Sequence, residues 1–214
     1  MEGNINTRIL DFTDNNLKDI SKCVENGGIV VVPTENVYGF IFSGNYTQTL
    51  ERVYELKRRP HNKGFVISVT KETIEQFAFL SPIVKEIIDN CWPSSLVVVL
   101  DKKPSISDDI TGGLNSAAFI NLKSPVVDYI VKNVKGPICG TTCNLSGESE
   151  IIKCSDAIKY FKNHVDIIVN NDAMLEFNTH STIISFVEDP PRVLRKGAFS
   201  PEYIKEKYVP NLMI

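Results

Sequence analysis

The chain has 214 residues, of which 43% are hydrophobic and 23% are charged, and its formal net charge is −3. This balance is typical of a globular domain and excludes collagen, coiled-coil and disordered chains. The slight negative charge also excludes a surface that is basic throughout and binds DNA without specificity. No apolar run reaches the ~20 residues of a transmembrane helix, so we expect no membrane association.

The five cysteines and the first residues indicate a cytoplasmic protein. Five is an odd number, no two cysteines form a CxxC pair, and the start MEGNINTRIL lacks the basic and apolar regions of a secretory signal. We therefore expect reduced thiols, no metal site built from cysteines and a cytoplasmic location.

Apolar periodicity predicts alternating helices and strands in the first half of the chain. Asp14 is suited to cap a helix that Gly27 ends, and the β-branched run that follows predicts a strand buried on both faces. The expected elements are, in order, a helix over 14–27, strands over 29–32 and 37–42, a helix over 47–58, a strand over 65–69, helices over 71–79 and 82–90, and a strand over 96–100.

The second half begins with a loop over residues 101–115, which is rich in Gly, Ser, Asp and Pro. The expected elements after it are a strand over 117–122, a helix over 125–133, a strand over 138–141, a helix over 155–163, strands over 165–169, 182–186 and 192–194, and a helix over 201–208. No linker or repeat divides the chain, so we predict one α/β domain over residues 1–214, built around a large sheet.

Four polar segments directly follow apolar strands or helices, and α/β proteins bind ligands at the ends of their strands. Residues 33–39 present hydroxyl, carboxylate, amide and phenol groups, and residues 57–63 carry four cations, which suit polyphosphate. Residues 140–147 combine hydroxyl and amide side chains with backbone NH groups that can form an anion nest. The fourth segment joins residues 180–182 to residues 195–197.

Each segment also has an ordinary structural interpretation. The first and third can be turns between strands, the cations can complement a helix C-terminus, and Arg195 can be a surface charge on an edge strand. The sequence has no Walker motif and no GxSxG elbow, and its three histidines are isolated. Cys143 has no base beside it in the sequence, so we expect no covalent nucleophile.

Together these segments resemble the YrdC/Sua5 family, the threonylcarbamoyl-AMP synthases, over about residues 27–197. The matching pairs, with the family motif first, are PTxTVYGL with PTENVYGF (33–40), KxRP with KRRP (57–60), WPGPLTLVL with WPSSLVVVL (92–100), SAN-SG with TCN-SG (142–147), STI with STI (181–183) and LRxG with LRKG (194–197). Each motif is weak alone, and their common order and spacing carry the resemblance.

The resemblance implies a single YrdC-like domain, with a twisted mixed parallel and antiparallel sheet, flanking helices and a large concave basic groove. It implies that ATP with Mg²⁺, bicarbonate and L-threonine are converted into threonylcarbamoyl-adenylate and pyrophosphate, for N6-threonylcarbamoyladenosine at position 37 of tRNA. Double-stranded RNA or tRNA and proteins of that pathway are the implied partners. The alternatives are a diverged nucleotide- or RNA-binding protein without this activity, and a related enzyme with another carboxylate or amine.

Carried over residue by residue, the resemblance also implies roles for side chains. Lys57 and Arg59 would be catalytic. The nucleotide would be held by Arg59, Lys63, Ser116, Thr142, Asn144 and Arg195. Threonine and its carbamate would be held by Thr34, Asn36, Tyr38 and Ser181. Because polyphosphate needs several cations, we expect Arg59, Lys63 and Arg195 to converge on one groove.

Among the departures from the family pattern, which include Ser94, Ser95 and Val97 in WPSSLVVVL, three bear directly on the substrates. Asn36 replaces the second threonine of PTxT, Ile120 replaces an arginine that meets the threonine carboxylate, and Glu150 replaces a serine near phosphate. An isoleucine cannot pair with a carboxylate, and Glu150 adds a repulsive charge. Lys123 is the cation that would have to replace the arginine. We therefore expect the nucleotide side of the site to match the family better than the threonine side.

Overall fold

Ten strands form one sheet in the computed structural model of the chain, which describes residues 5–176 and 179–214. The order of strands across the sheet is β1–β8–β2–β3–β7–β4–β6–β5–β9–β10. The strands are β1 (Arg8–Asp11), β2 (Val30–Pro33), β3 (Tyr38–Ser43), β4 (Val66–Ser68), β5 (Leu96–Asp101), β6 (Ser116–Ile120), β7 (Ile138–Thr142), β8 (Ile167–Asn170), β9 (Thr182–Ser185) and β10 (Arg192–Arg195).

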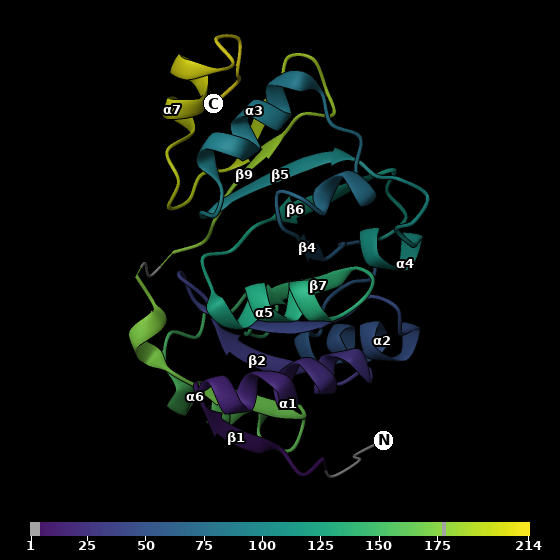
Figure 1. The fold of residues 1–214 in the computed structure, drawn as a ribbon, viewed down its shortest axis with the longest axis vertical. Helices are drawn as coiled ribbons and strands as arrows, with labels where there is room; N and C mark the ends of the chain where they lie inside the picture. The colour runs from purple at the N-terminus through teal and green to yellow at the C-terminus, as the bar shows by residue number, and fades with distance from the viewer. Residues whose placement is uncertain (1–4, 177–178) are drawn as a thin grey trace.

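The helices cover both faces of this sheet (Figure 1). They are α1 (Asp14–Glu25), α2 (Thr47–Lys57), α3 (Pro82–Cys91), α4 (Asp108–Thr111), α5 (Pro125–Asn133), α6 (Cys154–Phe161) and α7 (Pro201–Lys207), with 3₁₀ turns η1 (Ile74–Gln76) and η2 (Asp172–Met174). Helices α1 and α5 pack together against one face of β2, β3 and β8, and α2 and α6 contribute to the core on the other face.

Strand β2 shows why this sheet needs helices on both sides. Val31 joins the core that contains α2 and α6, whereas Val30 and Val32 join the core beneath α1 and α5. Successive side chains of a strand point to opposite faces, so a continuous valine run buries both. The predicted double burial of this strand is confirmed, since all four residues of β2 are buried.

The sheet mixes both kinds of strand pairing, which confirms the predicted α/β fold class. Strands β1 and β8, β8 and β2, β4 and β6, and β5 and β9 are parallel. The remaining neighbours are antiparallel, including β7 with both β3 and β4. Strand β7 therefore lies at the centre of the sheet, and its last residue, Thr142, is the register partner of Gly39 near the start of β3.

Three expectations about local structure are corrected by the tertiary contacts. The helix predicted over residues 71–79 is wrong, because the segment forms only η1 and then pairs with residues 101–103 through Phe79 N to Asp101 O (3.0 Å) and Lys103 N to Phe77 O (2.7 Å). Strand β1 was not predicted, since it is short and mostly exposed and exists by pairing with β8. Helix α4 interrupts the loop expected over 101–115.

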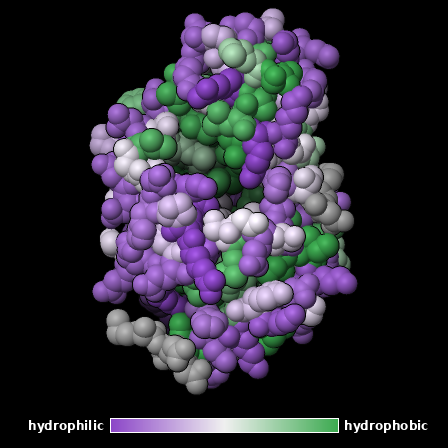
Figure 2. All heavy atoms as spheres, turned by 180° about the vertical axis from the view of Figure 1, so that it is seen from behind, coloured by the Kyte–Doolittle hydropathy of each residue, from purple (hydrophilic) through white to green (hydrophobic). Residues whose placement is uncertain are grey.

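The surface is mixed in polarity. On the face opposite to that of Figure 1, apolar side chains gather around a hollow in the upper half of the molecule, and polar side chains cover much of the rest (Figure 2). Among the residues that the structure describes, no helix has the length and apolar character needed to cross a bilayer.

Candidate functional site

A cavity lies where the central strands meet the ends of β5 and β9. It has a volume of about 100 Å³ and opens to solvent. Its lining comes from distant parts of the chain: Thr34, Asn36, Val37, Gly39, Phe40, Ile41, Val66, Ser68, Val97, Ile120, Leu122, Gly140, Thr141, Thr142, His180, Ser181 and Arg195. The sheet order explains this meeting, because β3 lies beside β7 and β5 lies beside β9.

Thr34 forms the turn between β2 and β3 that shapes one wall of the cavity. Its backbone N and its Oγ1 both donate to Val37 O, at 3.1 and 2.8 Å, and Oγ1 accepts from the backbone N of Asn36 and of Val37. A threonine hydroxyl can stabilise a turn in this way. The turn directs the side chain of Asn36 into the interior, where it is 3% exposed.

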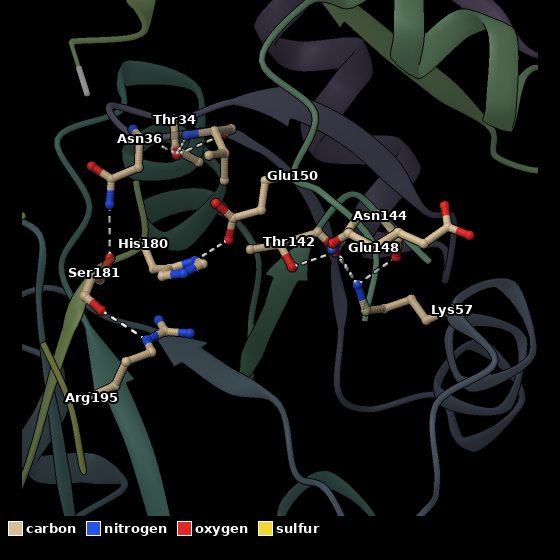
Figure 3. Close-up of polar contacts among 11 residues, drawn as sticks. Thr34, Asn36, Lys57, Thr142, Asn144, Glu148, Glu150, His180, Ser181 and Arg195 are labelled. Carbon is tan, nitrogen blue, oxygen red and sulfur yellow. Dashed lines mark hydrogen bonds and ion pairs between the residues drawn. The ribbon is translucent and has the colours of Figure 1, made fainter. Parts of the chain in front are cut away.

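Asn36 connects the turn to the starts of β5 and β9, and Figure 3 shows its contact with Ser181 before β9. Its Nδ2 donates to Ser181 Oγ at 3.0 Å, and its Oδ1 accepts from Ser95 Oγ at 2.8 Å. Because β5 and β9 are parallel with Leu96 opposite Thr182, the serines before them lie at the same end of the sheet. The structure therefore brings together Thr34, Asn36 and Ser181, three of the expected threonine-side residues.

Lys57 organises the segment after β7. Its Nζ donates to Thr142 O, to Asn144 O at 2.8 Å and to Asn144 Oδ1 at 2.9 Å, and Thr142 Oγ1 donates to the same Oδ1 at 2.6 Å. Lys57 is 2% exposed, and burial lowers its pKa from 10.5 to about 8. The ammonium group thus holds the Thr142–Asn144 backbone and is absent from the cavity lining, although Thr142 is part of that lining.

Arg195 is the arginine of the cavity lining. Its Nε donates to Ser181 O at 3.1 Å, which orients the side chain along the mouth of the cavity. Its two terminal nitrogens have no hydrogen-bond or ion-pair partner among the described residues. Burial lowers the pKa of Arg195, and the nearby Glu150 carboxylate opposes this shift. The free edge of the guanidinium can donate hydrogen bonds to an anionic group of a ligand.

The other expected nucleotide residues lie outside this lining. Arg59 donates from Nε to Lys63 O at 3.1 Å and from Nη2 to Gly64 O at 2.6 Å, so it shapes the turn before β4. Lys63 is exposed, and Ser116 is the first residue of β6, opposite Asp101. The expected convergence of Arg59, Lys63 and Arg195 on one groove, and the basic character of that groove, stay predictions.

Tyr38 lies on the face of β3 that points away from the cavity. It is fully buried, and its hydroxyl donates to Asp172 Oδ1 at 2.7 Å. Burial and this hydrogen bond raise the pKa of the phenol. The cavity lining includes Gly39 but not Tyr38, whose side chain belongs to the hydrophobic core. The family resemblance grouped Tyr38 with Thr34 and Asn36, and the structure places Tyr38 outside the cavity lining.

Ile120 faces the cavity, where a cationic side chain was expected from the family pattern. It lies on an apolar wall with Val97 and Leu122, and only 4% of Ile120 is exposed. Lys123 does not replace the missing cation, because its side chain is exposed and its Nζ pairs with Glu176 Oε1 at 2.6 Å. The wall beside Asn36, Ser95 and Ser181, here called the Asn36 cluster, therefore carries no cationic side chain among the described residues.

Two contacts at this site were not anticipated from sequence. Ser95 donates to Asn36, and Glu150 Oε1 contacts His180 Nδ1 across the mouth of the cavity (Figure 3). Ser95 lies in the WPSSLVVVL segment (92–100), and the match of this segment to a family motif was the available signal for Ser95. The Glu150–His180 contact joins residues 30 positions apart, and no local pattern announces it.

The remaining candidates have structural surroundings. Cys143 is fully buried in the hydrophobic core, and burial raises the pKa of its thiol, which disfavours the reactive thiolate. Within residues 5–176 and 179–214, no three His, Cys, Asp or Glu side chains are grouped closely enough to hold a metal ion.

Comparison with known proteins shows the family of this chain. The Sua5/YciO/YrdC family model, described as Telomere recombination, matches residues 22–197. The chain belongs to this family. It is 29% identical over 182 residues to a protein of Methanocaldococcus jannaschii named "Putative threonylcarbamoyl-AMP synthase", covering 85% of each chain. It is 25% identical to the threonylcarbamoyl-AMP synthase of Bacillus subtilis, covering 92% of this chain and 57% of that protein.

A solved structure has the same fold. The structure of Pyrococcus abyssi Sua5 complexed with L-threonine superposes with a TM-score of 0.84 at 24% identity. The match covers 96% of this chain and 61% of the Sua5 chain. The present chain thus spans just over half of the B. subtilis and P. abyssi proteins and most of the M. jannaschii protein.

Proposed function

We propose that this protein is a threonylcarbamoyl-AMP synthase, a nucleotidyltransferase that uses ATP, bicarbonate and L-threonine. The observation that carries the proposal is the meeting of Thr34, Asn36, Thr142, Ser181 and Arg195 at one cavity, from segments far apart in the chain. The names of the M. jannaschii and B. subtilis relatives and the threonine complex of P. abyssi Sua5 support the same activity.

The proposed reaction needs no nucleophile from the protein. The threonine amine and bicarbonate form a carbamate with loss of water. One carbamate oxygen attacks the α-phosphorus of ATP, the bond to the β-phosphate oxygen breaks, and pyrophosphate leaves. The products are threonylcarbamoyl-AMP, pyrophosphate and water. The protein must hold anions close to one another and keep water from a labile carbamate, which is catalysis by orientation and exclusion of solvent.

The residues divide naturally between these tasks. The hydroxyl and amide groups of Thr34, Asn36 and Ser181 would orient the amino acid and carbamate, and their mutual hydrogen bonds restrain their rotamers. Arg195 would neutralise an anionic group of the nucleotide or leaving pyrophosphate. Lys57 would act at one remove, by holding the backbone of Thr142 and Asn144 in place.

Mg²⁺ is expected to arrive with ATP and to neutralise its phosphates. Such ions are bound largely through substrate phosphates and water. Among the described residues, the cavity lining offers hydroxyls, an amide and a guanidinium but no carboxylate, which fits a metal carried by the nucleotide. The product would serve tRNA modification at adenosine 37. Direct binding of tRNA or double-stranded RNA, the partner proteins of that pathway and a cytoplasmic location complete the proposal.

One alternative has an observation in its favour. Ile120 places an aliphatic side chain on the cavity wall next to the Asn36 cluster, and Lys123 is turned away to Glu176. A protein that binds nucleotide without the threonine reaction would have no need of a cation there. A related enzyme that uses another carboxylate or amine would fit the same wall.

The test is pyrophosphate release from ATP with bicarbonate, measured with and without L-threonine, and with mass-spectrometric detection of threonylcarbamoyl-AMP. Release that depends on threonine supports the synthase. Release with another amine or carboxylate selects the related enzyme. ATP binding by calorimetry with no release under any of these conditions selects the binding protein.

A matched pair of variants ties the activity to the cavity. Arg195→Gln removes the guanidinium from the lining, and Arg192→Gln removes one from an exposed position on the same strand, where it pairs with Glu188. Loss of one charged hydrogen bond costs about 1.5–3 kcal/mol, which weakens ATP binding about tenfold to a hundredfold. Equal effects of the two variants would contradict the assignment of the cavity as the nucleotide site.

A further inference from the structure

The segment of residues 144–151, here called the strap, follows β7 and leads toward α6, and its last residue lies beside the start of β3. It is anchored at both ends by backbone hydrogen bonds, from Ser146 N to Lys57 O and from Tyr38 N to Ile151 O, each 2.8 Å long. Between the anchors, Asn144 Nδ2 donates to Glu148 O at 2.7 Å, and Gly147 has a positive φ of +88°. The middle of the strap therefore depends on few contacts.

Glu150 is the strap residue that contacts a side chain of the cavity lining. Its Oε1 contacts His180 Nδ1, on the segment that leads into β9 (Figure 3). A carboxylate only accepts hydrogen bonds, so His180 donates from Nδ1. The Glu150 side chain is 15% exposed and that of His180 is 45% exposed. The contact thus holds a carboxylate, itself part of the second cavity's lining, beside His180 of the first cavity's lining.

The negative charge of Glu150 opposes the binding of ligand anions near Arg195. His180 and Arg195 both line the cavity, and the Glu150 charge raises the pKa of Arg195 against the larger, lowering effect of burial. Glu150 forms no ion pair with Arg195 within 4.0 Å in the described chain, and the terminal nitrogens of Arg195 are without partners there. A phosphate or carboxylate that binds Arg195 would therefore enter beside an existing negative charge.

The strap also has room behind it. A second cavity of about 550 Å³ separates it from α6, with Asn144, Leu145 and residues 147–151 on the strap side and Asp156, Tyr160 and Phe161 on the helix side. Displacement of Glu150 from His180 can thus be accommodated without disturbing the hydrophobic core.

We propose that Glu150 and His180 form a latch beside the cavity, and that the Glu150 charge repels the anionic group of a ligand that binds Arg195. Binding then requires the strap to open, so the apparent affinity is the intrinsic affinity reduced by the fraction of open molecules. The inference rests on the proposed function only for the choice of ATP and pyrophosphate as the anions.

The test compares the binding of ATP and of inorganic pyrophosphate, by calorimetry, among four proteins. Glu150→Gln removes the charge and leaves only a weaker, neutral hydrogen bond to His180, so it loosens the latch. His180→Ala frees Glu150 to move away. Glu148→Gln is the matched control, because it removes a carboxylate of the same strap that forms no ion pair with His180. All variants are first checked for an unchanged unfolding midpoint.

Glu150→Gln is expected to tighten the binding of both anions about fivefold to tenfold, the effect of removing one nearby like charge in a partly solvated site. The gain should shrink at high salt, since screening weakens the repulsion. His180→Ala should give a smaller gain, and the double variant should bind no better than Glu150→Gln alone, because both changes open one latch. Glu148→Gln should bind as the wild type does.

Unchanged or weaker anion binding by Glu150→Gln, or an equal gain with Glu148→Gln, would overturn the latch. A variant with an altered unfolding midpoint is replaced by Glu150→Ser, for which the same gain is expected. Failure of the latch and failure of the proposed function are separable. Tighter anion binding without threonine-dependent turnover keeps the latch and rejects the synthase, whereas turnover without any gain does the opposite.

Discussion

The buried lysine at the end of α2 makes a prediction about stability and pH. The Lys57 ammonium is 2% exposed, and burial lowers its pKa from 10.5 to about 8. Between these values the unfolded chain carries a proton on this amine that the folded chain lacks. Stability rises with pH wherever the unfolded state binds more protons, so Lys57 adds stability across this window.

The size of the effect follows from the shift. One pKa unit corresponds to about 1.36 kcal/mol, so 2.5 units give a rise of about 3 kcal/mol between pH 8 and 10.5. The three oxygens that accept from Nζ favour the charged form and make this value an upper bound. Lys57→Met has no titrating amine and should lose the rise.

The assay is urea unfolding at a series of pH values, with the free energy of the variant subtracted from that of the wild type. The subtraction is needed because buried thiols act in the opposite direction. Burial raises the pKa of Cys23 to about 12, so the unfolded chain loses that proton first and stability falls. Lys63→Met, which makes the same charge change at an exposed site, is the control.

A difference between wild type and Lys57→Met that stays flat or falls from pH 8 to 10.5 would refute the reasoning. It would mean that the carbonyl acceptors outweigh the desolvation of the ammonium group. The same rise for Lys63→Met would show that net charge, and not burial, controls the effect.

Further predictions concern single side chains. Tyr38→Phe removes the hydrogen bond to Asp172 and should lower the unfolding free energy by about 1–2 kcal/mol in urea titrations; an unchanged value would contradict the buried contact. Cys143→Ala should leave ATP binding and turnover within about 1.5 kcal/mol of wild type, and complete loss of turnover would make Cys143 a nucleophile. L-threonine should bind weakly to the protein loaded with a non-hydrolysable ATP analogue, because Ile120 offers no charge to its carboxylate; tight, stereospecific binding in calorimetry that survives Lys123→Ala would refute this.

Local pattern determined much of the architecture of this protein. The valine run of β2 required burial on both faces, and the polar residues directly after it had to emerge at a strand end. The ordered motifs from Thr34 to Arg195 pointed to one family because their spacing reflects one fold. These features are readable because each depends on neighbours along the chain.

The directions of individual side chains were decided only by the tertiary structure. Lys57 turns inward because its ammonium donates hydrogen bonds to two carbonyls and an amide oxygen of a segment about 85 residues away. Tyr38 points away from the cavity because its hydroxyl donates to Asp172, a residue 134 positions away. Residues 71–79 do not form the predicted helix because the end of this segment forms backbone hydrogen bonds with residues 101–103. Such contacts bring together residues distant in sequence, so local propensity and periodicity carry no information about them.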